Sequence, residues 1–161
     1  NNKLIVEALY EILDYLNLKH SSFTGFTFRE DIDPQGLLLT AEGDESTGIT
    51  IRVPRNVLDF DLVLLSNILM HEMYHVHQRS GDHQIELREE REWQAYTEMI
   101  FHKKFTQLPI LSNFYVKQFG EKALTYYKRM PDDMKAKYAE EKADLEKIIQ
   151  TIYDKENKPK E

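Results

Sequence analysis

"LSNILMHEMYHVHQRSGDH", residues 65–83, contains four of the six histidines of this 161-residue chain. An apolar run leads into the histidines, and Gly81 follows them, where glycine can adopt the left-handed backbone that ends helices. Asp59 or Asp61 can accept hydrogen bonds from the first free backbone amides of a helix. The stretch therefore predicts a helix that begins near residue 60, stops at Gly81 and carries the histidine cluster.

The first two histidines of the cluster have the spacing of a metal-binding pair. His71 and His75 are four residues apart, so on a helix they point the same way, about one turn apart. Glu72 directly follows His71, which places its carboxylate beside a bound ion, where it can accept a proton from water. The spacing favours a metal site with a neighbouring base over the alternative, a solvent-exposed helix face of histidine and glutamate.

The next helical pattern supplies a candidate third ligand. It runs from about His83 to Phe105, with Asp82 as its candidate N-cap. Glu92 lies on the less polar face of this helix, which is marked by residues three, four and seven positions later: Ala95, Tyr96 and Met99. Three other acids fall off that stripe: Glu86, Glu90 and Glu98. An acid on an inward face is costly unless it is paired or bound to a cation, so Glu92 is the expected ligand.

Antiparallel packing of the two helices would complete the site. Glu92 then comes opposite His71 and His75, which gives two histidines, one carboxylate and a position open to water. Glu89, one turn earlier, is the second choice of ligand. The ordinary alternative for Glu92 is a salt bridge in solvent to an arginine of its own helix.

Two motifs in this region resemble those of the HExxH zinc metallopeptidases, specifically the gluzincin branch. His71-Glu72-Met73-Tyr74-His75 matches HExxH, and Glu92-Trp93-Gln94-Ala95 matches the ExxA that carries the third ligand of that branch. The likeness covers residues 64–101 and is similar to the compact versions found in bacterial and phage proteins. The resemblance implies a single zincin-like metallopeptidase domain with Zn²⁺ as cofactor and a peptide or protein as substrate. It also implies that a metal-bound water, activated by Glu72, attacks a peptide carbonyl.

Three further features bear on that chemistry. Tyr96, one turn beyond Glu92, is the expected donor to the developing oxyanion, and Tyr74 is the alternative. The strand GITIRV, residues 48–53, stands where the resembling enzymes often place an edge strand that pairs with extended substrate.

The remaining histidines are not expected as ligands, although His83 could still bind through the turn as an alternative to Glu92. The other zinc branch takes a third histidine from HExxHxxGxxH, but Gln78 stands where its glycine belongs and His83 comes two residues too late. His77 faces away from the metal-binding pair on an ideal helix, which predicts a surface role. His20 and His102 have no ligand partner that the sequence identifies.

The rest of the chain predicts a mostly helical α+β fold with a small three-stranded antiparallel sheet ahead of the HExxH helix, and the resemblance implies that this fold is zincin-like. An amphipathic helix is expected from about Lys3 to Leu18, within residues 1–18. The sheet is expected within residues 23–53, from three pieces: FTGFTFRE (23–30), GLLLTA (36–41) and GITIRV (48–53). After the metal-binding helix pair of 60–105, further helices are expected over 111–156, with a break at Gly120 and a last helix after Pro131.

Bulk composition excludes several partners. The formal charge of −7 argues against nucleic acid, because phosphate backbones are bound by lysine and arginine faces. No stretch approaches the roughly eighteen apolar residues of a membrane span, so no membrane partner is expected. The lack of cysteine excludes thiolate metal sites and disulfides, while compartment and oligomeric state stay open.

The function predicted from these features is zinc-dependent peptide hydrolysis. The alternative is a catalytically inactive zincin-like module that binds or regulates, which the small size and acidic composition suggest. A third reading is a metal-free helical protein in which the motif is accidental. An accessible fourth position on the ion separates the first from the second, and metal content separates both from the third.

Overall fold

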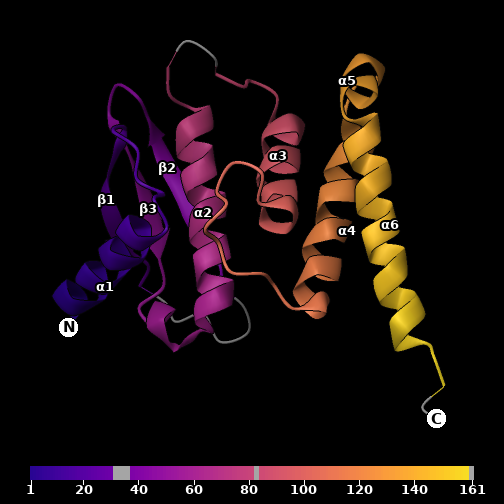
Figure 1. Cartoon of the computed structure of the whole chain (residues 1–161). Coiled ribbons are helices and arrows are strands. Elements are labelled where there is room, and N and C mark those ends of the chain that lie inside the picture. The colour runs from indigo at the N-terminus through magenta and orange to yellow at the C-terminus, as the bar shows by residue number, and fades with distance from the viewer. Residues whose placement is uncertain (31–36, 82–83, 160–161) are drawn as a thin grey trace.

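The computed structural model describes residues 1–30, 37–81 and 84–159, and the fold is α+β, as predicted (Figure 1). One sheet contains the three strands: β1 (Phe23–Phe28), β2 (Thr40–Asp44) and β3 (Gly48–Val53). The helices of the first half are α1 (Asn2–Tyr15), the short 3₁₀ helix η1 (Val57–Asp59) and α2 (Leu62–Gln78). The second half contributes α3 (Arg88–Phe101), α4 (Asn113–Arg129), α5 (Asp132–Lys137) and α6 (Ala139–Glu156).

The sheet is mixed, so the predicted antiparallel meander was wrong. The strand order is β1-β3-β2, in which β2 runs antiparallel to β3 and β1 runs parallel to it. The chain between β1 and β2 covers residues 29–39, far more than the tight turn of a hairpin needs. The second strand can therefore pair on the far side of β3 instead of folding back beside β1.

The second strand also begins later than the predicted 36–41. Gly36 lies outside the described residues, and Leu37, Leu38 and Leu39 precede β2 without pairing to β3. All three leucines line a cavity beside α2 and α3. The apolar run was therefore mistaken for a strand because cavity-lining and strand-core residues have the same composition.

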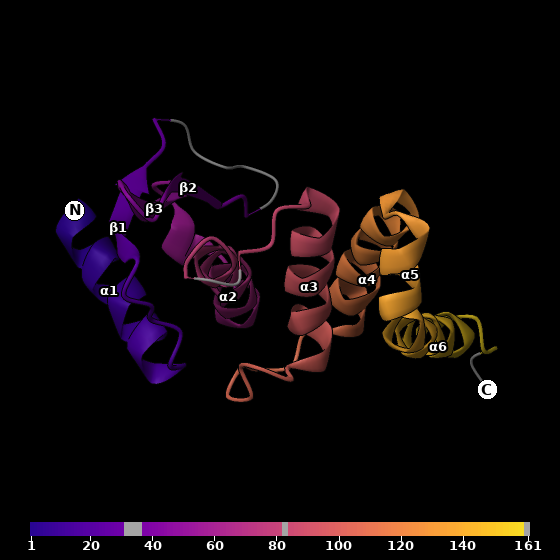
Figure 2. The same cartoon turned by 90° about the horizontal axis from the view of Figure 1, so that it is seen from above.

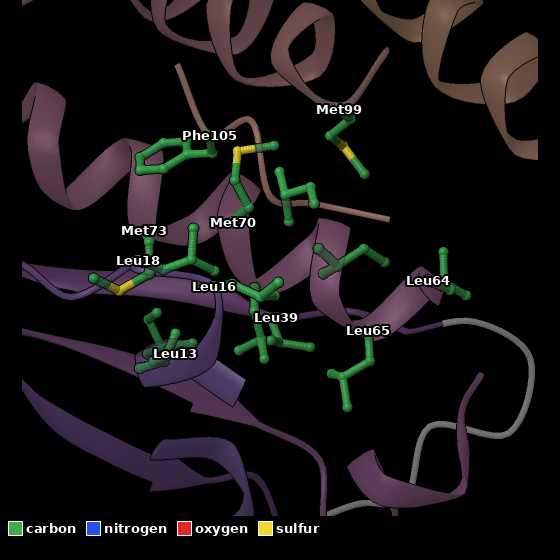
Figure 3. Close-up of a cluster of buried hydrophobic side chains, with 14 of the residues drawn as sticks. Leu13, Leu16, Leu18, Leu39, Leu64, Leu65, Met70, Met73, Met99 and Phe105 are labelled. Atoms are coloured by element: carbon green, nitrogen blue, oxygen red, sulfur yellow. The ribbon is translucent and has the colours of Figure 1, made fainter. Parts of the chain in front are cut away.

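The main hydrophobic core lies between one face of the sheet and the helices α1 and α2. Alternate residues of β3 are fully buried in it: Ile49, Ile51 and Val53. Arg52, on the other face of the same strand, is exposed. Figure 3 shows side chains of this cluster from three helices, among them Leu13, Leu65 and Met99. The core holds α2 firmly against the sheet, with its histidines at one side.

α3 lies between α2 and α4, with α6 beyond α4 (Figures 1 and 2). Its far side forms a second buried cluster with α4 and α6: Trp93, Ala123, Tyr127, Met130, Leu145 and Ile149. Glu90 and Glu98, which lie off the stripe of Glu92, are buried on α3 as well. Glu90 accepts a hydrogen bond from the Tyr138 hydroxyl, and Glu98 accepts one from the backbone amide of Lys104. Both sides of α3 are thus covered, and its inward acids are individually satisfied.

The ends of α2 and α3 differ by a few residues from the predicted ones. Of the two candidate caps for α2, Asp61 is the N-cap, and its carboxylate accepts the Leu64 amide at 3.0 Å. α2 ends at Gln78, short of Gly81, whose φ of +78° is nevertheless left-handed. The predicted start of α3 at His83, with Asp82 as cap, lies outside the described residues, and the helix itself begins at Arg88.

α1 follows its prediction more closely. Leu9 and Leu13 of its apolar stripe are fully buried. The helix ends at Tyr15, three residues before the predicted Leu18, and Asn17 beyond it takes a left-handed φ of 54°. The turn at Asn17 redirects the chain towards β1.

The predicted break at Gly120 was wrong, because α4 runs unbroken through it. A Cβ atom at this position would lie 2.9 Å from Ile149 Cδ1 and 3.2 Å from Leu145 Cδ1, so the missing side chain lets α6 approach closely. The predicted last helix forms as two pieces, α5 and α6, and Leu145, Ile149 and Ile152 of its stripe are buried. Among the described residues, no helix is long and apolar enough to cross a membrane.

Candidate metal centre

Two imidazoles meet on the buried side of α2. His71 and His75 lie one helical turn apart, and their side chains are only 8% and 6% exposed. Their Nε2 atoms are 3.2 Å apart. The apolar residues that precede them on α2 bury this face of the helix, so the two nitrogens converge away from bulk solvent.

α3 brings the carboxylate of Glu92 against both rings. One oxygen lies 3.3 Å from His71 Nε2, and the other lies 3.3 Å from His75 Nε2. In a tetrahedral zinc site with ligands at about 2.0 Å, neighbouring ligand atoms are about 3.3 Å apart. Each imidazole nitrogen is thus about as far from the other nitrogen, and from one carboxylate oxygen, as two ligands of the same zinc ion would be. The acid that reaches the histidines is therefore Glu92, not Glu89 one turn earlier on the same helix.

Gln78, which was not among the predicted site residues, orients His75. Its Nε2 donates to the backbone oxygen of Arg91 at 3.0 Å, and a carbonyl can only accept. Its Oε1 must then be the atom that faces His75 Nδ1 at 2.8 Å, so this ring nitrogen carries the proton. In the neutral ring, Nε2 is consequently a bare lone pair, which is the form that binds a metal.

Glu72 lies close to the two imidazoles. Its side chain is buried, and Oε2 accepts the backbone amide of Ala41 at 2.9 Å. An oxygen of Glu72 also lies within 4.8 Å of the ligand nitrogens of His71 and His75. Burial raises the pKa of Glu72, despite the opposing influence of the two histidines and the Ala41 amide. A buried carboxylate with a raised pKa, next to a metal position, is suited to proton transfer.

The electrostatics of the cluster favour a cation. Burial acts to raise the pKa of Glu92, but hydrogen bonds and charge from His71 and His75 outweigh it and hold that pKa well below its usual range. Burial likewise acts to lower the pKa of His75, yet its hydrogen bond to Glu92 and the charges of Glu72 and Glu92 raise it overall. Two carboxylates against two imidazoles therefore attract positive charge, whether a proton or a metal ion.

A cavity of about 80 Å³ opens beside the metal centre. His71 and Glu72 form part of its wall. The other residues that line it come from the segment before β2 and from three helices: Leu37, Leu38, Leu39, Ile68, Tyr96, Met99, Phe119 and Lys122. The centre is thus open on the side that carries the candidate base.

The two candidate oxyanion donors lie in different places. The ring of Tyr96 is 4.4 Å from that of His71, between centroids, and lines the cavity with Glu72. Tyr74 instead lines a separate pocket with Glu98 and Lys104. Tyr96 is therefore the tyrosine that the fold brings to the centre.

The strand nearest the centre is β2, so the expectation that residues 48–53 form the edge strand was wrong. β3 is the central strand and pairs on both sides, whereas β2 lies at the edge next to α2. Both outward backbone groups of Ala41 are used: the amide donates to Glu72, and the carbonyl accepts from Arg79 at 2.9 Å. β2 thereby connects the sheet to the candidate base.

The other described histidines lie apart from the centre. His77 faces away from it, half-buried, with its ring 4.4 Å from that of His20. His102 ends α3 in a left-handed conformation and bonds the Asn67 side chain at 2.9 Å. His83 lies outside the described residues.

Of the site residues that were not predicted, one has a signal in the sequence and two do not. Gln78 follows His75 by three residues, a spacing that places both on one helix face and signals a contact. Ala41 and Lys122 carry no such signal, because strand pairing and the packing of α4 on α3 bring them to the centre.

No protein-family model, curated protein or solved structure matches this chain. Its own geometry shows a His-Glu-x-x-His cluster on a helix, compatible with an HExxH motif and joined by a glutamate from the next helix.

Proposed function

We propose that this chain is a zinc-dependent peptidase of the gluzincin type. The observation that carries the proposal is the convergence of His71 Nε2 and His75 Nε2, 3.2 Å apart, on the Glu92 carboxylate, a different oxygen of which lies 3.3 Å from each nitrogen. Glu72 lies close to both histidines and lines the cavity. The arrangement separates the residues that would hold the metal from the residue that would act as base.

Each side chain has a distinct part in the proposed reaction. A zinc ion at this centre would supply Lewis acidity, polarising the peptide carbonyl and lowering the pKa of a water molecule. Glu72 accepts the proton of the attacking water and passes it to the leaving amine. The Ala41 amide holds the Glu72 carboxylate in place, and Tyr96 donates a hydrogen bond to the oxyanion.

The open side of the centre favours hydrolysis over a purely binding role. Structural zinc sites are closed by a fourth protein ligand, while catalytic sites keep one position for water or substrate. The cavity next to His71 and Glu72 leaves room for such a position. We therefore prefer the peptidase to the inactive zincin-like module.

The substitution Glu72→Gln tests the proposal. It preserves the size of the side chain and its acceptor for the Ala41 amide but removes the base. Zinc content, measured by elemental analysis after reconstitution, should stay at one ion per chain. Cleavage of a peptide mixture, followed by mass spectrometry, should fall by roughly a hundredfold to ten-thousandfold.

Glu89→Gln is the matched control, since it makes the same change one turn from Glu92 on α3. It should alter neither zinc content nor cleavage. Undiminished cleavage by Glu72→Gln would exclude Glu72 as the base, and failure of the wild-type chain to bind zinc would exclude the metal centre itself.

A further inference from the structure

The cavity beside the metal centre has room for an aliphatic side chain. Its volume is about 80 Å³. Its walls combine apolar side chains, among them Leu37 to Leu39 and Met99, with the polar groups of Glu72 and Lys122. An aliphatic side chain of a substrate can contact the apolar part of this lining.

One wall residue of this cavity is a cation. Lys122 of α4 is exposed, and its Nζ lies 5.8 Å from the ring centroid of Phe119 and 6.0 Å from that of Tyr96. Within the described ranges it forms no ion pair. In a chain with 28 acidic and 21 basic side chains, an unpaired lysine beside the candidate base is available to a ligand.

Two arginines extend this positive surface. Tyr126 stacks on Tyr96 with ring centroids 6.0 Å apart. The guanidinium carbons of Arg88 and Arg129 lie 5.9 Å and 5.6 Å from the Tyr126 ring centroid. Neither arginine is ion-paired to any residue that the structure describes. We call Arg88, Lys122 and Arg129 the cationic ledge.

We propose that the centre acts on acidic peptides, with an aliphatic side chain in the cavity and carboxylates of the same peptide on the cationic ledge. This inference rests on the peptidase function proposed above. The carboxylates can belong to aspartate or glutamate side chains or to the free C-terminus of the peptide, and both present the same planar anion to lysine and arginine.

In this proposal the peptide carboxylates are recognised by the combined attraction of several nearby cations, because no single exposed charge binds tightly. Exposed ion pairs are weak individually and are screened by salt, so selectivity comes from several cations that act on one ligand. A surface of one sign beside a reactive centre also raises the local concentration of oppositely charged substrate. Three cations on a chain of net charge −7 suit a short acidic peptide better than a nucleic acid backbone.

The first measurement maps cleavage sites in a peptide library from a digested proteome, using the zinc-loaded wild-type protein. Aliphatic residues should be enriched next to the cleaved bond, and aspartate and glutamate should be enriched within a few positions of it. Synthetic peptides then compare one cleaved sequence with three versions of it: acids replaced by amides, acids replaced by lysine, and the C-terminus amidated. The last version separates side-chain carboxylates from the terminal one.

Charge reversal locates the recognition on the cationic ledge. Lys122→Glu should lower kcat/KM for the acidic peptide by about tenfold and raise it for the lysine version, while Lys122→Arg should retain the wild-type preference. Lys128→Glu is the matched control, because it makes the same change on the same helix outside the cavity lining. It should leave the preference unchanged.

Peptide binding by the zinc-loaded Glu72→Gln protein, measured by fluorescence anisotropy at two salt concentrations, supplies a readout that needs no turnover. Salt-sensitive preference for the acidic peptide that Lys122→Glu abolishes supports the inference, even if the wild type cleaves nothing and the peptidase proposal fails. Cleavage with no dependence on peptide charge, or binding that Lys122→Glu leaves intact, overturns the inference and leaves the peptidase proposal standing.

Discussion

At the scale of single residues, the hydrogen bond between His75 and Gln78 determines which ring nitrogen is free for a metal. The Gln78 amide is fixed by two acceptors on α3, the Arg91 carbonyl at 3.0 Å and Gln94 Oε1 at 3.1 Å. It thus links the helix that carries the two candidate metal-binding histidines to the helix that carries Glu92. Partners of this kind orient a histidine and make it more basic towards the metal.

Gln78→Met should therefore weaken zinc binding without unfolding the protein. Methionine has a similar length and stays apolar in a buried position, but it cannot accept the His75 Nδ1 proton. We expect the Kd for zinc, measured by competition with a chromogenic chelator, to rise by about ten- to a hundredfold. Gln118→Met, an exposed position on α4, is the control and should leave the Kd unchanged. An unaltered Kd in Gln78→Met would show that the ring is oriented by other contacts.

The raised pKa of His75 and the lowered pKa of Glu92 make the stability of the metal-free fold depend on pH, and zinc binding depends on pH for the same reason. In the metal-free protein, the pair stabilises the fold fully between the ordinary pKa of glutamate, 4.5, and that of histidine, 6.5. This stability is lost as pH falls through the lowered pKa of Glu92 and as pH rises through the raised pKa of His75.

At pH values below the raised pKa of His75, zinc must displace the proton that this ring shares with Glu92. Calorimetric titrations in buffers of different ionisation enthalpy should show release of about one proton per zinc near pH 6.5, declining as pH rises above the raised pKa of His75. Zinc affinity should increase over the same range. Glu92→Gln removes the acceptor of this proton and should reduce the release, whereas an unchanged value would place the proton elsewhere.

The residues of the candidate centre that the sequence predicted are those related by local spacing. His71, Glu72 and His75 occupy consecutive turns of one helix, so helical geometry alone places them together. Glu92 needed the further assumption that the next helix packs against the first one, and its distances of 3.3 Å to both rings agree with that contact. Lys122 is contributed by a third helix, and no periodicity relates it to the others.

At the scale of elements, the differences between prediction and structure arise where tertiary packing overrides local pattern. Glycine usually weakens a helix, which led to the predicted break in α4. In the folded chain, Gly120 is buried where α6 crosses, and the absence of a side chain allows the contact. The sheet differs for a similar reason, since alternation identifies strands but does not reveal the order in which they pair.

Gly120→Leu should destabilise the protein, although leucine favours helix formation more than glycine does. Its side chain would have to enter the space occupied by Leu145 and Ile149, and overpacking of this kind costs about 1 to 3 kcal/mol. Urea unfolding measures the loss as a lower midpoint. Gln118→Leu on the exposed side of α4 should instead be neutral or slightly stabilising. Equal midpoints for the two variants would contradict the close contact between α4 and α6.

At the scale of the whole molecule, α3 connects two buried clusters. Its Met99 belongs to the main core with α1, α2 and the sheet, and its Trp93 belongs to the second cluster with α4 and α6. Tyr96 and Ile100 pack against both clusters. The candidate metal centre lies between α2 and α3, so its geometry depends on how the first cluster holds α2 and how both clusters hold α3. The chain follows the sequence prediction in its helical content and in this helix pair, whereas the layering of α4 and α6 on α3 depends on long-range contacts that local patterns do not encode.

Zinc should stabilise a fold that already exists without it. The main core contains buried hydrophobic residues from α1, the sheet, α2 and α3, and the candidate metal ligands are not part of it. The metal-free chain should therefore show helical circular dichroism and cooperative unfolding, which the single tryptophan, fully buried Trp93, reports by fluorescence.

Zinc at about a hundred times its Kd adds about 2.7 kcal/mol, which should raise Tm by about 5 to 10 °C for a domain of this size. Chelation should reverse the rise, and His75→Phe should abolish it. A metal-free chain that is unfolded, or an equal rise in His75→Phe, would mean that zinc acts somewhere other than the centre between α2 and α3.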